Sequence, residues 1–330
     1  MKFERLTRTM RQVAAVAAVS AVMTTGALAA EKMVYLFPAP DFLPAFTPFQ
    51  VAKQKGYYDE AGLDVEFRIG KGGADVAKQV AVGNADLGGG IGDTPIIVRA
   101  NGLPVKGVAL LGGKALTQLV IRDDSGAADV ASLKGKKVGV MAFQDTTYYN
   151  LLAALQSAGL SKDDVDIQAV GPAGMVQLMI SGDLDAISGT PDWAASIEGA
   201  GVDLTVIPIN DMFPAMAQAI LSSDDTIKDK PELVRGFVQA TLKGMRDVME
   251  DPEGSAKLLA ETVPQFGGKE EFLVEVMKRY DALVYETEDM SKLGAFDPER
   301  VKAVQDFYLD AGIISSETPL DDLYTNEFVE

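Results

Sequence analysis

The sequence contains neither cysteine nor histidine. Without cysteine the chain can form no disulfide, offers no thiol nucleophile and provides no attachment point for a lipid anchor at its N-terminus. Without an imidazole it cannot build a catalytic dyad or triad that depends on histidine. Zinc sites made of cysteine and histidine are excluded as well. These absences remove many nucleophilic enzymes and zinc proteins from consideration.

Basic residues are also scarce, with 30 Lys and Arg against 48 Asp and Glu and a formal net charge of −18. The first 30 residues hold four basic residues and Glu4, a net of +3, so the rest of the chain carries −21. A strongly acidic chain repels nucleic acid and anionic membrane surfaces. We therefore expect neither as a partner, although solubility alone accounts for most of the charge.

The N-terminus has the layout of a secretory signal peptide. Four basic residues within positions 2–11 precede an apolar run at 13–22, and Ala-Leu-Ala-Ala at 27–30 offers a small-residue cleavage site. The apolar run is shorter than the roughly 20 residues that a membrane-spanning helix needs. We expect residues 1–30 to be removed by cleavage near Ala29 or Ala30. Because nothing would then anchor the protein, we expect it in the periplasm of a two-membrane bacterium.

Short apolar runs alternate with helical patterns from residue 33 to about 223, which predicts an α/β fold with largely parallel strands. From Lys230 onward the pattern becomes mostly helical, and 231–249 has an apolar face at helical spacing. Expected helices include 49–58, 74–82, 147–158 and 173–181. Expected strands are 33–37, 63–69, 85–89, 105–111, 117–121, 137–141, 165–170, 185–188, 204–209 and 216–221.

The chain also repeats itself at a distance of 99 residues. Each copy follows a strand-like run and precedes a helix start, so two similar α/β lobes are expected, with a ligand cleft between them. We expect lobe 1 to comprise 31–120 and 221–330, with a helical C-terminal extension, and lobe 2 to comprise 121–220. The segments 117–121 and 216–221 are the candidate crossings. The repeated residues are Ala74, Gly83, Asp86, Gly90 and Asp93, which recur as Ala173, Gly182, Asp185, Gly189 and Asp192.

Five motifs follow one another along the chain: KGYYDEAGLDV at 55–65, GNADLG at 83–88, NGLPV at 101–105, LKGKKVGV at 133–140, and PELVR at 231–235 leading to DPE at 251–253. In this order they resemble the sulfonate, nitrate and thiamine-pyrimidine group of ABC-importer solute-binding proteins. The resemblance covers residues 33 to about 310. It implies a type II periplasmic-binding fold whose two lobes, joined by two hinge strands, close on a small solute and deliver it to a membrane permease. We further expect a monomer without enzymatic activity, cofactor or metal.

Ligands of open α/β sheets bind at the carboxyl ends of strands. This places the loops 38–47, 70–73 and 90–94 of one lobe and 143–148, 171–174 and 189–193 of the other at the cleft. Glycines there let the backbone approach a ligand, and helix N-termini receive an anion or a polar oxygen, although an ordinary turn explains any single glycine better. The candidate ligand-binding residues are Asp41, Phe46, Gly72, Gly92, Asp93, Thr94, Gln144, Thr146, Thr147, Tyr148, Asp192 and Trp193.

Two roles fit Asp93 and Asp192, the last pair of the repeat. Asp93 lies just before Thr94-Pro95 and Asp192 just after Thr190-Pro191. Both are expected helix starts, where an acid caps the helix or occupies its first turn. Alternatively, one or both carboxylates face the cleft and bind a ligand amine. Asp86 and Asp185, in contrast, are expected to be structural in both lobes.

The aromatic and basic residues of the cleft loops bear on the kind of solute. Trp193, the only tryptophan, and Phe46 suggest a clamp on a flat ring or a cationic group, with ordinary packing as the alternative. Lys71 is the only basic residue in these loops, whereas a phosphate dianion is normally met by Arg or Lys. We therefore favour a neutral or cationic solute, such as a thiamine-precursor pyrimidine. A sulfonate, taurine or nitrate remains the alternative, because helix N-termini can hold one oxyanion.

Other functions fit the residues less well. Relatives that make the thiamine pyrimidine use histidine and cysteine, which this chain lacks. A hydrolase with Asp93 and Asp192 as its carboxylate pair is a second enzymatic hypothesis, without a nucleophile motif to support it. A periplasmic receptor that binds a solute in order to signal would share the fold.

Overall fold

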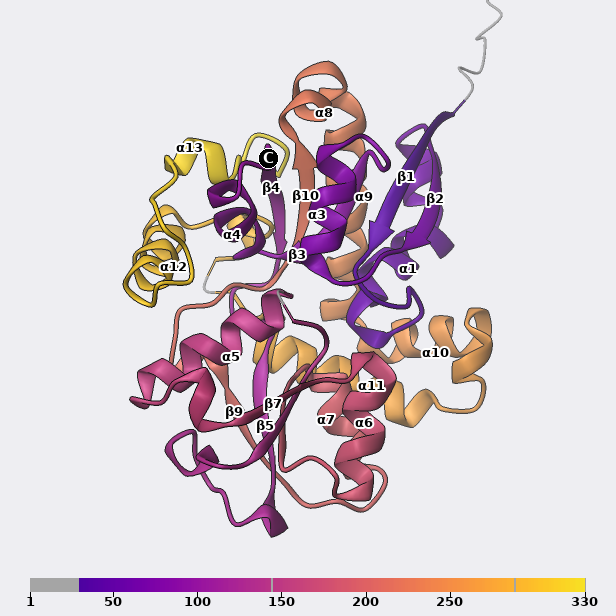
Figure 1. Cartoon of the computed structure of the whole chain (residues 1–330). Coiled ribbons are helices and arrows are strands. Elements are labelled where there is room, and N and C mark those ends of the chain that lie inside the picture. The colour runs from indigo at the N-terminus through magenta and orange to yellow at the C-terminus, as the bar shows by residue number, and fades with distance from the viewer. Residues whose placement is uncertain (1–29, 144, 288, 330) are drawn as a thin grey trace, which may run out of the picture.

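The structure, a computed structural model, describes residues 30–143, 145–287 and 289–329. It contains two five-stranded sheets, each packed between helices, one above the other in Figure 1. All ten strands expected from the sequence are present within a few residues of their predicted positions. Apart from Ala30, the predicted signal peptide lies outside the described residues.

The first sheet has the strand order β2-β1-β3-β10-β4. β1 pairs in parallel with β2 and β3, whereas β10 runs antiparallel between β3 and β4. The strands are β1 (Glu31–Phe37), β2 (Leu63–Ile69), β3 (Leu87–Ile91), β4 (Val105–Leu111) and β10 (Gln218–Ser223).

The second sheet repeats this plan in the order β7-β6-β8-β5-β9, with β5 antiparallel to both of its neighbours. The expectation of largely parallel strands therefore fails at β5 and β10. The chain reaches β5 and β10 from the other sheet and enters the new sheet at the edge where its parallel strands end. β5 and β10 must therefore run antiparallel to those strands. The strands are β5 (Gln118–Arg122), β6 (Lys137–Val140), β7 (Asp166–Ala169), β8 (Ala186–Gly189) and β9 (Leu204–Pro208).

The chain crosses between the sheets twice, through residues 112–117 and 209–217. The boundaries expected at 120/121 and 220/221 fall inside β5 and β10, each of which belongs wholly to one sheet. The apolar runs at 117–121 and 216–221, which were expected to be the crossings, correspond to β5 and β10, two buried inner strands that begin directly after the crossings.

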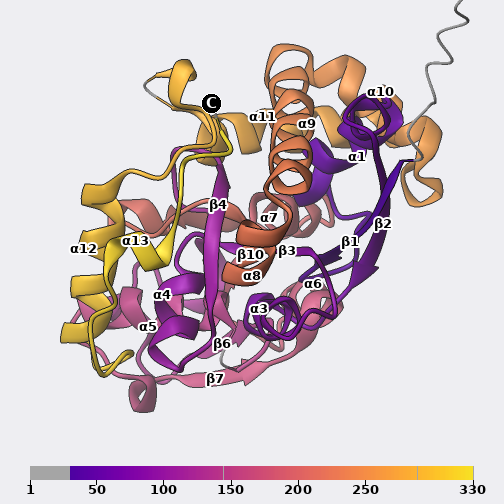
Figure 2. The ribbon, with the colours of Figure 1, turned by 90° about the horizontal axis from the view of Figure 1, so that it is seen from above.

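Helices cover both sheets and continue into a C-terminal helical region. α9 lies against α1 (Figure 2). The apolar face of α9 is buried, as its sequence pattern predicts. We call the part of the molecule around the first sheet the first half and the part around the second sheet the second half. The helices of the first half are α1 (Thr47–Gln54), α2 (Tyr57–Glu60), α3 (Gly73–Ala81), α4 (Thr94–Ala100), α8 (Asp224–Asp229) and α9 (Pro231–Glu250). Those of the second half are α5 (Thr146–Ser157), α6 (Gly171–Ser181) and α7 (Pro191–Glu198). The C-terminal helices are α10 (Pro252–Thr262), α11 (Glu270–Tyr280), α12 (Pro298–Asp310) and α13 (Leu320–Leu323).

The first part of the 99-residue repeat has a structural role in both halves. Gly83 and Gly182 follow α3 and α6 with φ angles of 75° and 81°, a conformation that favours glycine. The carboxylates of Asp86 and Asp185 accept hydrogen bonds from the backbone N–H groups of Val34 and Lys137, at 2.9 and 2.8 Å. Each aspartate therefore ties the loop before β3 or β8 to the neighbouring parallel strand, as expected.

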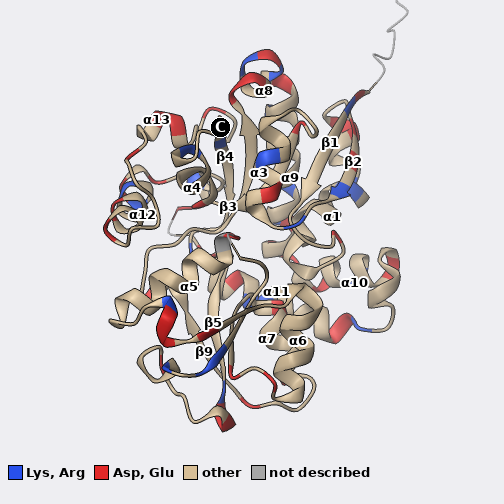
Figure 3. Cartoon of the chain, in the orientation of Figure 1, with Lys and Arg blue, Asp and Glu red and all other residues tan. Residues whose placement is uncertain are grey.

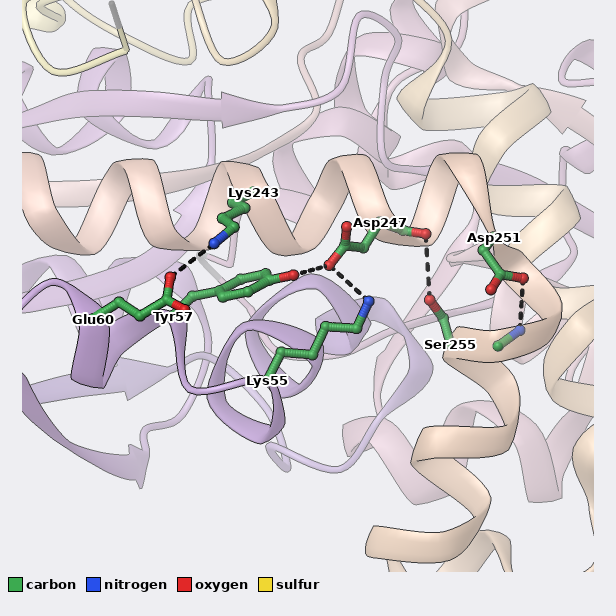
Figure 4. A network of polar contacts seen from close by, with 8 residues as sticks. Lys55, Tyr57, Glu60, Lys243, Asp247, Asp251 and Ser255 are labelled. Atoms are coloured by element: carbon green, nitrogen blue, oxygen red, sulfur yellow. Dashed lines mark hydrogen bonds and ion pairs between the residues drawn. The ribbon is translucent and has the colours of Figure 1, made fainter.

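The KGYYDE motif is held on α9 by a polar network (Figure 4). Asp247 accepts hydrogen bonds from the Tyr57 hydroxyl at 2.5 Å and from Lys55 Nζ at 2.9 Å. Lys243 Nζ lies 2.8 Å from a Glu60 carboxylate oxygen and 3.7 Å from the centre of the Tyr57 ring. Exposed ion pairs contribute little individually, but here they join segments almost 200 residues apart. The role of this motif in the structure is therefore to attach residues 55–60 to α9.

None of the helices in the described part of the chain combines the length and the apolar character that a membrane crossing requires.

Candidate functional site

A small cavity of about 60 Å³ lies between the two halves. The first half contributes Pro38, Ala39, Leu43, Ala45, Phe46, Gly73, Gly90 and Ile91. The second half contributes Met141, Asp145, Thr147, Thr190, Asp192 and Trp193, and the crossings with the strand that follows add Leu116 and Gln218.

Phe46, Thr147, Asp192 and Trp193 are the predicted site residues that line this cavity. Gln144 lies outside the described residues, and Thr146 is the first residue of α5. The remaining predicted residues are absent from the lining: Asp41, Gly72, Gly92, Asp93, Thr94 and Tyr148.

Two aromatic side chains face the cavity from opposite halves. Phe46 ends a short 3-10 helix (Pro44–Phe46), is 3% exposed and packs on Phe37 with ring centres 4.6 Å apart. Trp193 of α7 is 6% exposed and lies against Gly189, where an added Cβ would be 3.4 Å from the indole ring. The two halves therefore present one aromatic ring each to a shared space.

Asp192 connects the cavity to the C-terminal helical region. It is the second residue of α7, and its Oδ1 accepts a hydrogen bond from the Tyr280 hydroxyl of α11 at 2.7 Å. Six residues further along α7, Glu198 forms an ion pair of 2.6 Å with Arg279 of α11. Burial raises the pKa of Asp192, an effect that hydrogen bonds from Thr190 and Tyr280 oppose. Asp192 is thus both a first-turn acid and a cavity carboxylate.

Asp145 is a cavity residue that the sequence analysis did not single out. Its Oδ1 accepts hydrogen bonds from the backbone N–H and the hydroxyl of Thr147, at 2.9 and 2.7 Å, so it caps α5. Its Oδ2 accepts a hydrogen bond of 3.0 Å from the backbone N–H of Gly73 at the start of α3, in the other half. An aspartate directly before a predicted helix is a typical capping signal, but nothing local indicates the contact with α3.

The structure gives the two predicted glycines neighbours within the protein. Gly72 has a φ of 91°, and a Cβ there would lie 2.5 Å from Asp145 Oδ2. A Cβ at Gly92 would lie 2.6 Å from the Cβ of Met216 in the second crossing. Each glycine therefore makes room for a part of the chain, where a bound ligand had been expected.

Asp93 lies under the second crossing, away from the cavity lining. It is fully buried, and it accepts hydrogen bonds of 2.8 Å from the Met216 backbone N–H and from the Tyr308 hydroxyl of α12. Burial raises its pKa to about 6. The neighbouring Thr94 hydroxyl accepts a hydrogen bond from Ile91 N–H at 3.1 Å. The cleft-facing role predicted for Asp93 and Thr94 therefore has no support in this geometry.

The other two predicted residues lie elsewhere. Asp41 borders a separate hollow beside β1 and β2, and its carbonyl accepts a hydrogen bond from Gln50 Nε2 at 2.9 Å. Tyr148 is half-buried and packs beside Phe143 and Tyr149, with ring centres 5.6 and 5.5 Å away. Both were predicted in cleft loops, but Tyr148 belongs to α5 and neither residue lines the cavity.

The electrostatic character of the cavity follows from its lining. Charged residues of both signs occur on both halves (Figure 3), whereas the described residues of the lining include two carboxylates, Asp145 and Asp192, and no Lys or Arg. Lys71, the basic residue of the predicted cleft loops, is exposed and not part of the lining. An anionic solute would find two like charges here and no basic partner among the described lining residues.

A family model described as NMT1/THI5 like matches residues 43–255, more than half of the chain. The chain belongs to this family. A riboflavin-binding protein, RibY, of Chloroflexus aurantiacus is 28% identical over 289 residues, which is 86% of this chain and 82% of that protein. A 4-amino-5-hydroxymethyl-2-methylpyrimidine phosphate synthase of Aspergillus parasiticus is 24% identical, over 68% of this NMT1/THI5-like chain and 69% of the enzyme.

Among solved structures, the alkanesulfonate-binding protein SsuA of Xanthomonas axonopodis pv. citri, bound to MOPS, superimposes with a TM-score of 0.71. The match covers 89% of this chain and 98% of that one at 18% identity. Together with the sheet order, this confirms the two-lobed α/β periplasmic-binding fold expected for the NMT1/THI5-like chain.

Proposed function

We propose that this protein is the solute-binding component of an ABC importer, exported to the periplasm, where it captures a small solute in the cavity between its two halves. The observation that supports it best is the lining itself, with one aromatic side chain from each half, Leu116 of the first crossing and Gln218 directly after the second. We further propose that the two halves move as lobes about the crossings and close on the solute. The protein would then work as a monomer and hand the solute to a membrane permease.

The favoured solute is a planar nitrogen heterocycle that is neutral or cationic, such as a thiamine-precursor pyrimidine. Phe46 and Trp193 offer faces for stacking, and the amide of Gln218 offers both a donor and an acceptor. The names of the relatives support this class, because the ring systems of riboflavin and of the aminopyrimidine are both of this kind. A sulfonate, taurine or nitrate is the alternative, supported by the likeness to SsuA but opposed by the two cavity carboxylates.

We also propose that the protein is not an enzyme. Its synthase relative catalyses a reaction, but a chain without cysteine and histidine has no thiol or imidazole with which to do so. Nor do Asp93 and Asp192 form a carboxylate pair, since Asp93 contacts Met216 and Tyr308 while Asp192 contacts Tyr280.

A thermal-shift panel tests the proposal. A true ligand raises the unfolding temperature increasingly with its excess over the dissociation constant. The panel contains an aminopyrimidine, riboflavin, taurine, an alkanesulfonate and nitrate, and native mass spectrometry of freshly purified protein looks for a solute that co-purifies. Failure of every compound to shift the protein, with no solute in the mass spectrum, would count against solute binding.

Replacing Trp193 with alanine should weaken binding of the cognate solute about 30-fold, because an aromatic contact in a water-excluding pocket is worth about 2 kcal/mol. Calorimetry measures the affinity, since the variant lacks the only tryptophan. Trp193→Phe keeps a ring and should lose much less. Phe143→Ala, which removes an exposed aromatic residue outside the lining, is the matched control. An unchanged affinity in Trp193→Ala would place the solute elsewhere.

Asp192→Asn should weaken binding of a cationic solute about tenfold or more and that of a neutral one much less, because only the former pairs with the carboxylate. Tyr280→Phe is its control, because it removes the hydrogen bond to Asp192 from outside the lining. Titrations of both variants with a cationic and a neutral member of the panel separate charge recognition from lobe contact. Equal losses in the two variants would assign Asp192 to the contact between α7 and α11 alone.

A further inference from the structure

We propose that Asp145 is the residue that makes this cavity reject anionic solutes, because its carboxylate occupies the position at which an oxyanion would bind. The inference rests on the proposed solute-binding function and names the determinant of solute charge within that site.

The geometry around Asp145 is that of a bound anion. Its two oxygens accept hydrogen bonds from the backbone N–H groups of Gly73 and Thr147, at 3.0 and 2.9 Å, at the starts of α3 and α5. The Thr147 hydroxyl adds a third donor at 2.7 Å. Free N–H groups and the positive end of the dipole at a helix start attract negative charge. Here one helix from each half directs its start at the same buried carboxylate, which is 3% exposed.

The surrounding backbone is shaped for this carboxylate. Gly72 lies directly before α3 with a φ of 91°, and any larger residue there would place its Cβ 2.5 Å from Asp145 Oδ2. Gly73, Asp145 and Thr147 all belong to the cavity lining. The donors that would hold a sulfonate or nitrate oxygen at these helix starts are therefore already used by a fixed side chain of the protein.

Two consequences follow for the solute. An incoming anion would have to displace Asp145 from its donors or bind beside it, and like charges within a few ångströms repel strongly in a water-poor cavity. No Lys or Arg of the described lining offsets that repulsion. A neutral or cationic solute meets no such barrier. Because Gly73 and Asp145 lie in different halves, their hydrogen bond also joins the halves.

The test uses Asp145→Ser in the full-length mature protein. Serine keeps a good N-cap for α5 but removes the charge and vacates the space beside Gly72. Methanesulfonate and nitrate are the probes, titrated at constant ionic strength against chloride while the emission of Trp193, the only tryptophan, is recorded. The variant should bind methanesulfonate at least about tenfold more tightly than the wild type. Asp145→Asn, which removes the charge but keeps the bulk, should show a smaller gain.

Asp75→Asn is the matched control, because it removes a carboxylate from the first turn of the same α3 but outside the lining. It should show no gain. Circular dichroism confirms that each variant is folded, and Asp145→Asn decides the question if the serine variant is not. The inference is overturned if neither folded variant binds methanesulfonate more tightly than the wild type.

The same titrations separate this inference from the proposed function. A wild-type protein that binds methanesulfonate as tightly as the variants would overturn the role of Asp145 and leave solute binding in place. A wild type that binds no member of the panel, beside a serine variant that gains anion binding, would support the role of Asp145 and count against the proposed solute class.

Discussion

Replacing Arg300 with methionine is expected to lower the free energy of unfolding by about 3 kcal/mol. Each buried acceptor that loses a charged donor costs about 1–3 kcal/mol, and the half-buried acceptors here recover a part of this from water. Arg300 of α12 donates to the carbonyl of Gly113 in the first crossing at 2.7 Å. It also donates to the carbonyl of Pro214 at 3.1 Å, to Asn210 Oδ1 at 2.5 Å and to the carbonyl of Ala215, all in the second crossing. One side chain therefore holds both connections between the lobes.

Urea unfolding followed by circular dichroism measures the change. Lys302→Met is the matched control on the same helix, because Lys302 is exposed and forms an ion pair with Asp306 one turn away, an interaction worth about 0.3–0.5 kcal/mol. Arg300→Lys keeps the charge but loses the fork of donors, so it should fall between the other two variants. Equal stabilities of Arg300→Met and Lys302→Met would mean that the contacts with the crossings contribute nothing.

The sequence was sufficient to predict the architecture because the relevant signals are local. A buried strand requires a short apolar run, and each of the ten runs became a strand. Gly83 and Gly182 end helices in a conformation that favours glycine, and Asp86 and Asp185 make their contacts with the neighbouring strand. These features recur 99 residues apart because each lobe contains the same sequence of helix end, loop and parallel strand.

The strand directions were harder to predict because they depend on the path of the chain. The apolar runs of β5 and β10 do not differ from those of parallel strands. The sheet order shows that the chain enters a new sheet at each of these two strands, which is why they run antiparallel to their neighbours. The predicted lobe boundaries were a few residues late for the same reason, since buried inner strands and connecting strands are equally apolar.

The candidate site was predicted only in part, because a loop's position does not fix where its side chains point. Phe46 and Trp193 reach the cavity, whereas Asp41 borders a separate hollow and Tyr148 packs beside Phe143, although all four were predicted in cleft loops. Asp93 lies at the strand end where a ligand group was expected, but its partner Tyr308 is 215 residues away in α12. No local pattern connects the two residues.

Asp93→Asn is expected to make the protein more stable at pH 7.5 and to remove a pH dependence that the wild type shows. The Tyr308 hydroxyl lies 2.8 Å from Asp93 Oδ2 and 2.7 Å from Asn150 Oδ1, yet a hydroxyl donates only one proton. The Asn150 amide is oriented by its own hydrogen bond to the Thr117 hydroxyl at 2.9 Å. Both contacts are satisfied when Asp93 is protonated and donates to Tyr308. Asparagine reproduces this arrangement and still accepts from Met216.

The direction of the effect follows from the pKa of Asp93, which burial raises from 3.8 to about 6. An acid whose pKa is raised on folding contributes stability that is present in full below pH 4 and is lost as the pH rises through 6. The wild type should therefore be less stable than Asp93→Asn by about 2–3 kcal/mol at pH 7.5, with the difference shrinking toward pH 4.5. Urea unfolding of both proteins at several pH values measures it.

Asp164→Asn is the control with the opposite sign. The hydrogen bond from Ser161 N–H, followed by the contacts with Lys134 and the Ser161 hydroxyl, lowers the pKa of Asp164 to about 2, so its contribution is lost only as the pH falls below 4. Its difference from the wild type should thus stay level between pH 7.5 and 4.5, while that of Asp93→Asn converges. A level difference for Asp93→Asn would show that the ionised form fits the site as well as the protonated one. The network of Tyr308 and Asn150 would then tie α12 to the crossings without a buried proton.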